Sequence, residues 1–413
     1  MASDDGKAPT LSTGLPILLP FLLYPAIDFV FRIATGLIAP DLSREFTLSA
    51  AELGLVSSVF FFAFGLAQLP LGVAFDRFGP RPIALGLFAV AIFGAILIVS
   101  ANGITGLIAG RILLGIGMSA SLIAGIKTAS LWLPDRMPLA TSLLVGATGI
   151  GGMMATVPFA ALLGHVDWRI GFLGLAGSIG LLFFLTLLQV PSVERHKPPG
   201  ILAQFRSFGT VFGSMGLWRF APIAMMGVGV GSAYQTLWAP LWLRDVAGYP
   251  AETVAWVMFA MLGTYAAGNF AFGWLAQWRQ RRGQSRMPPV LTAVILLIGC
   301  QTLLALEFVS AAMPLWIASA FLLSGAYAIY PIVTANFPAE FAARASTALN
   351  FLVFAAVFAI QSVLGLIIDS FPPSASGHFG TDAHQWALST AIGLQALSLA
   401  WYGLSIRHRW RLG

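Results

Sequence analysis

Long apolar segments separated by short polar connections recur along the whole chain of 413 residues. An apolar run of 18 or more residues is long enough to cross about 30 Å of hydrocarbon as an α-helix. We count twelve such segments, at 14–38, 50–74, 81–101, 104–130, 138–163, 170–190, 217–243, 252–277, 288–308, 314–336, 346–369 and 385–406. The pattern predicts an all-α membrane protein with twelve transmembrane helices.

The composition agrees with this pattern. Hydrophobic residues make up 58% of the chain and charged residues 9%, whereas a soluble domain has about a quarter of its residues charged. So few charges cannot cover a water-facing surface. The first apolar segment follows a polar stretch, Met1 to Thr13, and it is longer than the apolar region of a signal peptide and has no cleavage site. We therefore expect it to remain as a spanning helix.

Basic residues are concentrated in the connections that share a side with the N-terminus. That side carries Arg77, Arg81, Arg136, Arg195, Lys197, Arg206, Arg279, Arg281, Arg282, Arg286, Arg344, Arg407, Arg409 and Arg411, and the other side carries Arg44, Arg169 and Arg244. Cytoplasmic connections are enriched in Lys and Arg, so both termini are predicted to be cytoplasmic. The net charge of +6 then reflects a cytoplasmic (inner) membrane protein in contact with lipid, with no nucleic-acid partner.

Metal, redox and nucleotide chemistry find no support in the sequence. The single cysteine, Cys300, lies within an apolar segment, and the five histidines are not spaced as metal ligands. No Walker A sequence, His-Glu-x-x-His sequence or glycine-flanked nucleophilic serine is present. We therefore expect no metal, no cofactor and no enzymatic activity.

The longest connection, from Pro191 to Met215, divides the segments six and six. We predict an N-terminal six-helix bundle over 1–190, a cytoplasmic linker over 191–216 and a C-terminal six-helix bundle over 217–413. A degraded repeat supports this division, because Gly273 and the basic residues from Arg279 follow the eighth segment as Gly72 and Arg77 follow the second. Paired halves are typical of transporters that alternate access to a site between them.

Several motifs, in order along the chain, resemble those of the major facilitator superfamily (MFS). They are Gly72-Val-Ala-Phe-Asp76-Arg77-Phe-Gly79-Pro80-Arg81, Gly110-Arg111-Ile-Leu-Leu-Gly115-Ile-Gly117, Trp132-Leu-Pro-Asp-Arg136, Trp168-Arg169 and Phe337-Pro-Ala-Glu340 with Arg344. The resemblance implies a secondary transporter built from two bundles that work by alternating access. It also implies that Gly72, Asp76, Arg77, Gly79 and Arg81 form a conformational latch between the bundles. The alternative is an ordinary solvated turn.

The latch hypothesis carries two structural expectations. The first is that Asp76 accepts hydrogen bonds from amides near Ala345 to Thr347, at the start of the eleventh segment, where the helix dipole favours an anion. The second is that Gly72 allows close helix contact.

Few ionisable residues lie inside the apolar segments, and such residues are costly enough to be functional candidates. Tyr24, Asp28 and Arg32 follow one another at intervals of four and share one helix face. Arg111 is predicted at a similar depth. One interpretation is that Asp28 holds Arg32 or Arg111 and exchanges a proton, while the free guanidinium binds a carboxylate. The other is a purely structural ion-pair network.

The remaining candidates are less clear. Lys127 lies near the inner end of the fourth segment, where it is either a substrate or gating group or a lysine that reaches the interface. In the second half, the polar aromatic and amide residues Tyr234, Gln235, Tyr327 and Tyr330 either bind the ligand or join helices. For any single one of them the packing role is favoured. The resemblance makes them the better ligand-binding candidates of the second half, because the seventh and tenth helices face the cavity in the family.

The leading hypothesis is therefore a monomeric carrier that moves a small organic anion together with protons. Proton-coupled efflux of drugs or amphipathic compounds and lipid flipping remain alternatives. A cavity rich in aromatic residues and methionine could serve efflux, although the excess of basic residues argues against cations as substrates, and an apolar cavity with basic residues suits lipid phosphates. The sequence does not identify the substrate.

Overall fold

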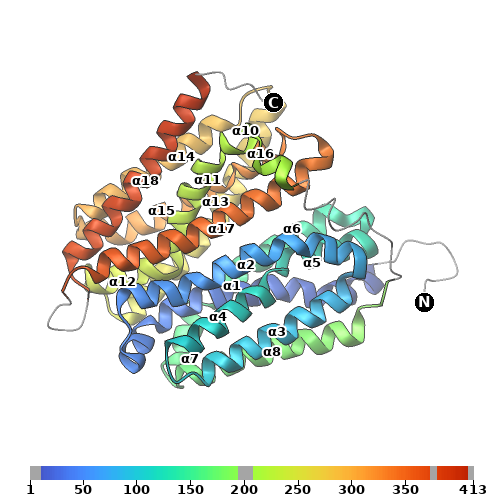
Figure 1. Ribbon diagram of the computed structural model, residues 1–413, viewed down its shortest axis with the longest axis horizontal. Coiled ribbons are helices and arrows are strands. Elements are labelled where there is room, and N and C mark those ends of the chain that lie inside the picture. Colours follow the sequence, from blue (N-terminus) through green and yellow to red (C-terminus); the bar gives the residue numbers. More distant parts are fainter. Residues whose placement is uncertain (1–10, 194–207, 373–378, 408–413) are drawn as a thin grey trace.

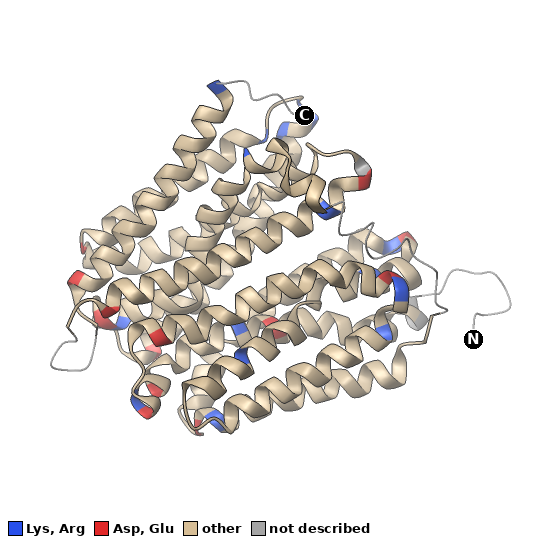
Figure 2. Ribbon diagram, in the orientation of Figure 1, with Lys and Arg blue, Asp and Glu red and all other residues tan. Residues whose placement is uncertain are grey.

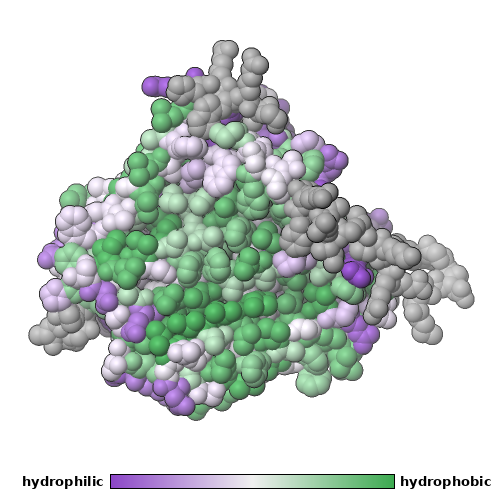
Figure 3. Space-filling view, viewed as in Figure 1, coloured by the Kyte–Doolittle hydropathy of each residue, from purple (hydrophilic) through white to green (hydrophobic). Residues whose placement is uncertain are grey.

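The computed structural model describes residues 11–193, 208–372 and 379–407. Throughout these residues the secondary structure is helical and contains no strand, and eleven helical segments are long and apolar enough to cross a membrane. The face seen in Figure 3 has a broad apolar band, with hydrophilic residues gathered towards its margins. The prediction of a multi-pass helical membrane protein is thus confirmed.

The helices of the first half of the chain are arranged side by side (Figure 1). They are α1 (Leu11–Phe46), α2 (Ala50–Phe78), α3 (Pro80–Val99), α4 (Ile104–Met118), α5 (Ser121–Trp132), the 3₁₀ turn η1 (Pro134–Arg136), α6 (Met137–Met154), α7 (Val157–Leu163) and α8 (Trp168–Gln189). Only Ser119 and Ala120 separate α4 from α5, so the predicted fourth segment consists of two consecutive helices with a short break between them.

The second half lies on the other side of the molecule (Figure 1). It comprises α10 (Met215–Trp218), α11 (Ala221–Ala233), the π-helix η2 (Tyr234–Trp238), α12 (Ala239–Asp245), α13 (Ala251–Arg281), α14 (Met287–Ala305), the 3₁₀ turn η3 (Val309–Ala311), α15 (Ala312–Tyr327), α16 (Tyr330–Thr334), α17 (Ala339–Asp369) and α18 (Thr381–Arg407). Elements α11, η2 and α12 run without a break through the predicted seventh segment, which is not one of the eleven candidate spans.

Local sequence explains where α2 begins and ends. Ser49 and Glu52 form a capping box, in which the Ser49 amide donates to the Glu52 carboxylate (2.9 Å) and the Glu52 amide donates to the Ser49 hydroxyl (3.3 Å). At the other end Gly79 has a φ of +77°, in the left-handed region that favours glycine. Pro80 then occupies the first turn of α3, where its missing N–H costs nothing.

Helices α2 and α17 pack against each other along the seam between the two halves (Figure 1). We call the end of the molecule that contains Gly79, Val193 and Phe208 the linker end, and the other the opposite end. Near the opposite end the two helices are joined by hydrogen bonds between Ser58 and Ser362 (2.9 Å) and between Gln361 and Ser57 (3.0 Å). At the linker end they border a cavity of about 730 Å³. The halves are therefore closed together at one end and separated at the other.

Candidate substrate-binding site

Asp28 and Arg32 form a two-pronged ion pair on α1. Arg32 donates from Nε to Asp28 Oδ1 (3.0 Å) and from Nη2 to Asp28 Oδ2 (2.7 Å), and Ser121 of α5 donates to the same Oδ2 (2.8 Å). The Asp28 side chain is 1% exposed and that of Arg32 is 12% exposed. The spacing of four residues made this ion pair available in the sequence. The bonds to Asp28 use Nε and Nη2 of Arg32, and its Nη1 nitrogen has no hydrogen-bond partner in the described parts of the chain.

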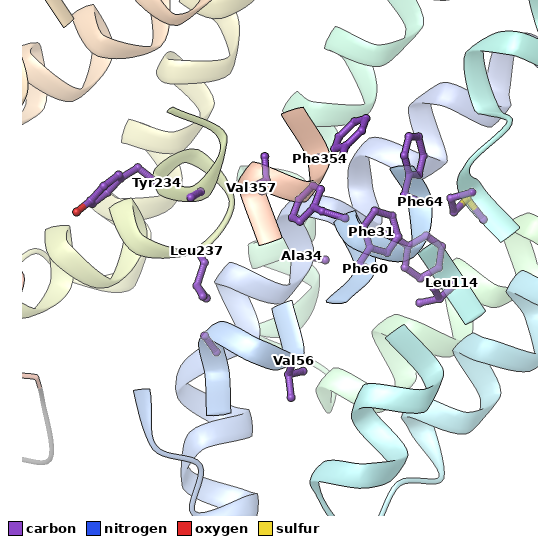
Figure 4. Packing of buried hydrophobic residues seen from close by; sticks show 14 of the residues in the cluster. Phe31, Ala34, Val56, Phe60, Phe64, Leu114, Tyr234, Leu237, Phe354 and Val357 are labelled. Carbon is purple, nitrogen blue, oxygen red and sulfur yellow. The ribbon is translucent and has the colours of Figure 1, made fainter. Parts of the chain in front are cut away.

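Aromatic rings from both halves surround the Arg32 guanidinium. Its central carbon lies 4.3 Å from the ring centre of Phe64 on α2 and 5.3 Å from that of Phe354 on α17. The two rings also contact each other, with centroids 4.8 Å apart. Figure 4 shows Phe64 and Phe354 near the packed residues Phe31 and Phe60. A cation with apolar walls and one uncommitted nitrogen is suited to a small ligand that carries a negative group.

Arg111 lies apart from this ion pair. The residue is 2% exposed, and it donates from Nη1 to the Phe31 carbonyl (3.1 Å) and from Nε to the Val56 carbonyl (3.4 Å). Its Nη2 has no hydrogen-bond partner in the described chain. Of the two arginines proposed as partners of Asp28, the structure pairs Arg32 with it, and Arg111 instead links α4 to α1 and α2.

Tyr24, the third member of the predicted stripe, is fully buried. Its hydroxyl donates to the Gly117 carbonyl, and its ring packs edge-on against Phe88. In this arrangement Tyr24 joins α1 to α4 and has no free hydroxyl donor for a ligand.

A chain of amides crosses the seam one helical turn from the aromatic pair. Asn350 on α17 donates to Gln68 Oε1 on α2 (2.5 Å), Gln68 donates to the Ser119 carbonyl (3.0 Å), and Tyr330 donates to Asn350 Oδ1 (3.0 Å). The Tyr330 ring stacks on that of Tyr327, at 6.0 Å between centroids. The structure thus brings Tyr327 and Tyr330 together, and their ring cluster continues to Tyr265, at 5.8 Å between the Tyr265 and Tyr327 centroids.

Gln68, Phe64 and Ser121 are not among the site residues predicted from the sequence. A signal was present, because Phe64, Gln68, Gly72 and Asp76 recur every four residues and so share one face of α2. That face runs from the Arg32 site to the cavity, which Gln68, Gly72 and Asp76 all line.

Lys127 and Asp76 form an ion pair in the cavity wall. Lys127 Nζ lies 2.7 Å from Asp76 Oδ1, so α5 is joined to α2, and both side chains are partly exposed. Asp76 was expected to accept hydrogen bonds from amides near Ala345 to Thr347, but α17 begins at Ala339, so these amides lie inside the helix and not at its start. The structure shows a different partner, because the linker end is open and the cavity lies between α2 and Thr347.

The other latch residues also lie at this open end. No atom outside the immediate backbone lies within 4 Å of the position that a Gly72 Cβ would occupy, so the predicted close contact is absent in this arrangement. Arg81 donates to the Leu187 carbonyl (2.8 Å), and the Arg77 guanidinium lies 5.2 Å from the Phe78 ring centre. Among the described residues, neither arginine has a hydrogen bond or ring contact that bridges the two halves.

Tyr234 and Gln235 are directed into the second half. Both line a small pocket with Gln301 and Trp316, residues of α14 and α15. Tyr234 points away from the labelled residues of the first half (Figure 4), and its ring lies 5.4 Å from that of Trp316. Helix η2 itself does contact α1, where Gly36 packs against the Thr236 carbonyl. In the seventh segment, the Thr236 backbone thus meets α1 and the Trp238 side chain lies next to Gly54 of α2, whereas Tyr234 and Gln235 line the pocket in the second half.

Charged residues lie mostly near the helix ends, with few in the middle of the molecule (Figure 2). Among the described residues there is no group of three or more His, Cys, Asp and Glu side chains that could hold a metal ion. The chemistry that the central residues offer is reversible binding: a guanidinium, a carboxylate, amides and tyrosines around a seam that opens at one end.

The apolar spanning helices, together with a buried ion pair at the seam whose Arg32 Nη1 has no described hydrogen-bond partner, are typical of a membrane transport protein. The chain belongs to the Major Facilitator Superfamily, whose family model matches residues 21–367, and it is therefore a transporter and not an enzyme. A solved structure of a bacterial homolog of the human lysosomal transporter Spinster, described as inward-facing and unoccupied, superposes with a TM-score of 0.80 at 16% identity, over 96% of this chain and 98% of that one.

Three curated relatives illustrate the similarity. The chain is 32% identical to the uncharacterized transporter YybO of Bacillus subtilis over 173 residues. This matched stretch covers 41% of this chain and 40% of YybO. It is 26% identical to a probable L-galactonate transporter of Escherichia coli over 393 residues, 89% of this chain and 83% of that one. It is 24% identical over 297 residues to a hexuronate transporter of Bacillus subtilis, 65% of this chain and 67% of the relative.

Proposed function

We propose that this protein is a secondary active transporter that moves a small organic anion together with protons across the cytoplasmic membrane by alternating access. The observation that carries the proposal is the Arg32 guanidinium at the seam between the halves. Two of its nitrogens bind Asp28, and its Nη1 has no hydrogen-bond partner among the described residues. A carboxylate on the ligand would supply that partner in an apolar setting, where a charge-assisted hydrogen bond is strong.

Asp28 is the group proposed to carry the proton. The carboxylate is buried and compensated by Arg32 and Ser121. If a substrate carboxylate draws the guanidinium away, Asp28 loses most of its compensation, and protonation becomes the favourable way to keep it buried. Anion binding and proton binding would then be coupled through one arginine.

The substrate class that we propose is a hydroxylated monocarboxylate of about the size of a hexonate or hexuronate. Near Arg32 lie groups that bond to hydroxyls, namely Gln68, Asn350 and Tyr330, which already form one chain of hydrogen bonds. The names of the similar L-galactonate and hexuronate transporters support this class. Tyr327 belongs to the same cluster through its contact with Tyr330. Lys127, in the cavity wall, is proposed to attract the anion on its way to Arg32.

The proposed mechanism needs two bundles that rock about the seam. We propose that residues 1–190 and 217–413 are these bundles, that Ala221–Asp245 provides a twelfth span, and that the protein works as a monomer. We place the linker end in the cytoplasm, because most described basic residues at helix ends lie there. They are Arg77, Arg81, Arg136, Arg279, Arg281, Arg282, Arg286 and Arg344, against Arg44, Arg169 and Arg244 at the opposite end. The arrangement described above is then open to the cytoplasm.

The proposal is tested by uptake of radiolabelled L-galactonate and D-glucuronate into proteoliposomes under an imposed pH gradient. We expect saturable uptake by the unaltered protein and a fall in the uptake rate of roughly tenfold or more in Arg32→Lys. The reason is that an ammonium group lacks the planar donor geometry with which a guanidinium can bind Asp28 and a substrate carboxylate at the same time. Arg44→Lys is the matched control, since Arg44 lies on the same helix with an 81% exposed side chain, and it should transport normally.

Asp28→Asn separates substrate binding from proton coupling. We expect this variant to lose accumulation driven by the pH gradient and to retain exchange of labelled for unlabelled substrate across the membrane. Full gradient-driven accumulation by Asp28→Asn would refute the role of Asp28. Normal transport by Arg32→Lys would refute the proposed site.

A further inference from the structure

A small polar pocket lies inside the second half, on the far side of η2 from α1. Its polar lining consists of Tyr234 and Gln235 from η2, Gln301 from α14, and Trp316 and Ser319 from α15. The volume in which the centre of a water molecule can lie inside this pocket is about 10 Å³. That space is about what one ordered water requires.

The π-helix brings two consecutive side chains to this one pocket. The amide of Ala239 donates to the carbonyl of Tyr234, five residues earlier, so the turn holds one more residue than an α-helical turn. In an α-helix consecutive side chains point about 100° apart. Here Tyr234 and Gln235 both line the pocket, and Thr236 follows at the contact with α1.

Three buried donors at this pocket have no hydrogen-bond partner in the described chain. They are the Tyr234 hydroxyl, Gln235 Nε2 and Trp316 Nε1, on residues that are 2%, 5% and 1% exposed. Buried polar groups are nearly always bonded, and each unbonded one costs about 1–3 kcal/mol. Three such groups around one water-sized space indicate a shared acceptor.

The acceptor must be small and neutral. No charged residue is among those lining the pocket, so an anion there would be desolvated without compensation. The carbonyl oxygen of Gln301 already accepts a hydrogen bond from Gln395 (2.8 Å), and Ser319 donates to the Leu315 carbonyl (2.8 Å). A single oxygen fits these donors if it accepts hydrogen bonds from Gln235 Nε2 and Trp316 Nε1. With the Tyr234 hydroxyl it forms a third hydrogen bond, in which either oxygen can be the donor.

We infer that this pocket is a binding site for one neutral oxygen, either of an ordered water or of a substrate hydroxyl, held by Trp316, Gln235 and Tyr234. The bound oxygen stabilises the π-helix on the side that faces α14 and α15, while the backbone of the same π-helix contacts α1. The inference stands without the transport proposal, because it rests only on the donors and the space around them.

The test is X-ray footprinting in H₂¹⁸O on the purified full-length protein. A bound water next to an aromatic ring causes oxidation of that ring even where bulk solvent is excluded. We expect ¹⁸O to be incorporated at Trp316 and Tyr234, and we expect none at Tyr24, an equally buried tyrosine whose hydroxyl is bonded to the Gly117 carbonyl. Tyr249, in the connection between α12 and α13, serves as the labelled control. If Tyr249 is labelled and both pocket residues stay unlabelled, the inference is overturned.

Adding L-galactonate distinguishes the two sources of the oxygen. Labelling that is unchanged by the ligand assigns the site to water, and labelling that falls assigns it to a substrate hydroxyl. The melting temperature of Tyr234→Phe gives an independent readout. If the hydroxyl is bonded to a held oxygen, the variant melts at a lower temperature, as Tyr24→Phe must. A rise in the melting temperature would mean that the hydroxyl was unbonded and would overturn the inference.

Discussion

At the scale of single residues, the buried charges differ in how they are compensated. Asp28 and Arg32 neutralise each other through two hydrogen bonds. Arg111 is equally buried, yet its described hydrogen bonds go only to two backbone carbonyls, and its Nη2 has no described partner. Carbonyl oxygens carry partial charges, so they offset only part of the cost of removing a guanidinium from water. A charge kept at such a cost inside a membrane makes Arg111 a candidate functional residue.

This difference leads to a prediction for Arg111→Leu. We expect the melting temperature of the purified protein to stay the same or to rise, because the substitution removes an incompletely compensated charge and keeps the helix contacts apolar. We also expect L-galactonate transport to fall by roughly tenfold or more, as residues of this kind usually serve transport. A clear fall in the melting temperature would contradict this prediction, because it would show that the hydrogen bonds of Arg111 to α1 and α2 stabilise the protein by more than the burial of the charge costs.

At the scale of elements, α2 shows how one helix serves both ends of the molecule. Near the opposite end, a Cβ on Gly54 would lie 2.8 Å from the Gln361 carbonyl oxygen, so α2 and α17 touch through their backbones. Towards the linker end the same face carries Phe64 and Gln68, which still contact α17, and then Gly72, where the cavity separates the two helices. The glycines at the two ends of this stripe therefore meet different surroundings in the present arrangement.

Substitution of these glycines by alanine is expected to have opposite effects on stability. Gly54→Ala should destabilise by about 1–3 kcal/mol, because the new methyl group overpacks a backbone contact. Gly72→Ala should be neutral or stabilising by up to about 1 kcal/mol, since the added Cβ meets open space and alanine favours the helix. Thermal unfolding in detergent measures both. Equal effects of the two substitutions would show that the packing of α2 against α17 is not what distinguishes the two glycines.

At the scale of the whole molecule, the two halves are joined at one end and apart at the other. The Ser58 and Ser362 hydroxyls are 2.9 Å apart across the seam, whereas the cavity separates Gly72 from Thr347. A carrier that alternates access must break the first contact and close the second gap.

A disulfide across the closed end tests this requirement. The chain has one cysteine, so Cys300→Ala gives a cysteine-free background for the pair Ser58→Cys and Ser362→Cys. We expect the pair to oxidise readily, to abolish L-galactonate transport when oxidised, and to regain transport on reduction. The matched control pair, Gly72→Cys and Thr347→Cys, should not oxidise in the arrangement described here. Undiminished transport by the oxidised first pair would rule out movement at this contact.

The sequence by itself determined the family, the eleven helices that are long and apolar enough to span a membrane, and the possibility of an ion pair between Asp28 and Arg32. The tertiary structure decided which of the two candidate arginines pairs with Asp28. Hydrophobicity along a segment, a motif and a spacing of four residues on one helix are local properties, so they can be read without knowing how helices pack. Only the tertiary structure decided that Arg111 binds carbonyls, that Asp76 pairs with Lys127 at an open end, and that a π-helix turns Tyr234 and Gln235 into the second half. These contacts depend on the depth and rotation of each helix against its neighbours, and a shift of one residue in a helix moves a side chain by about 100° around its axis.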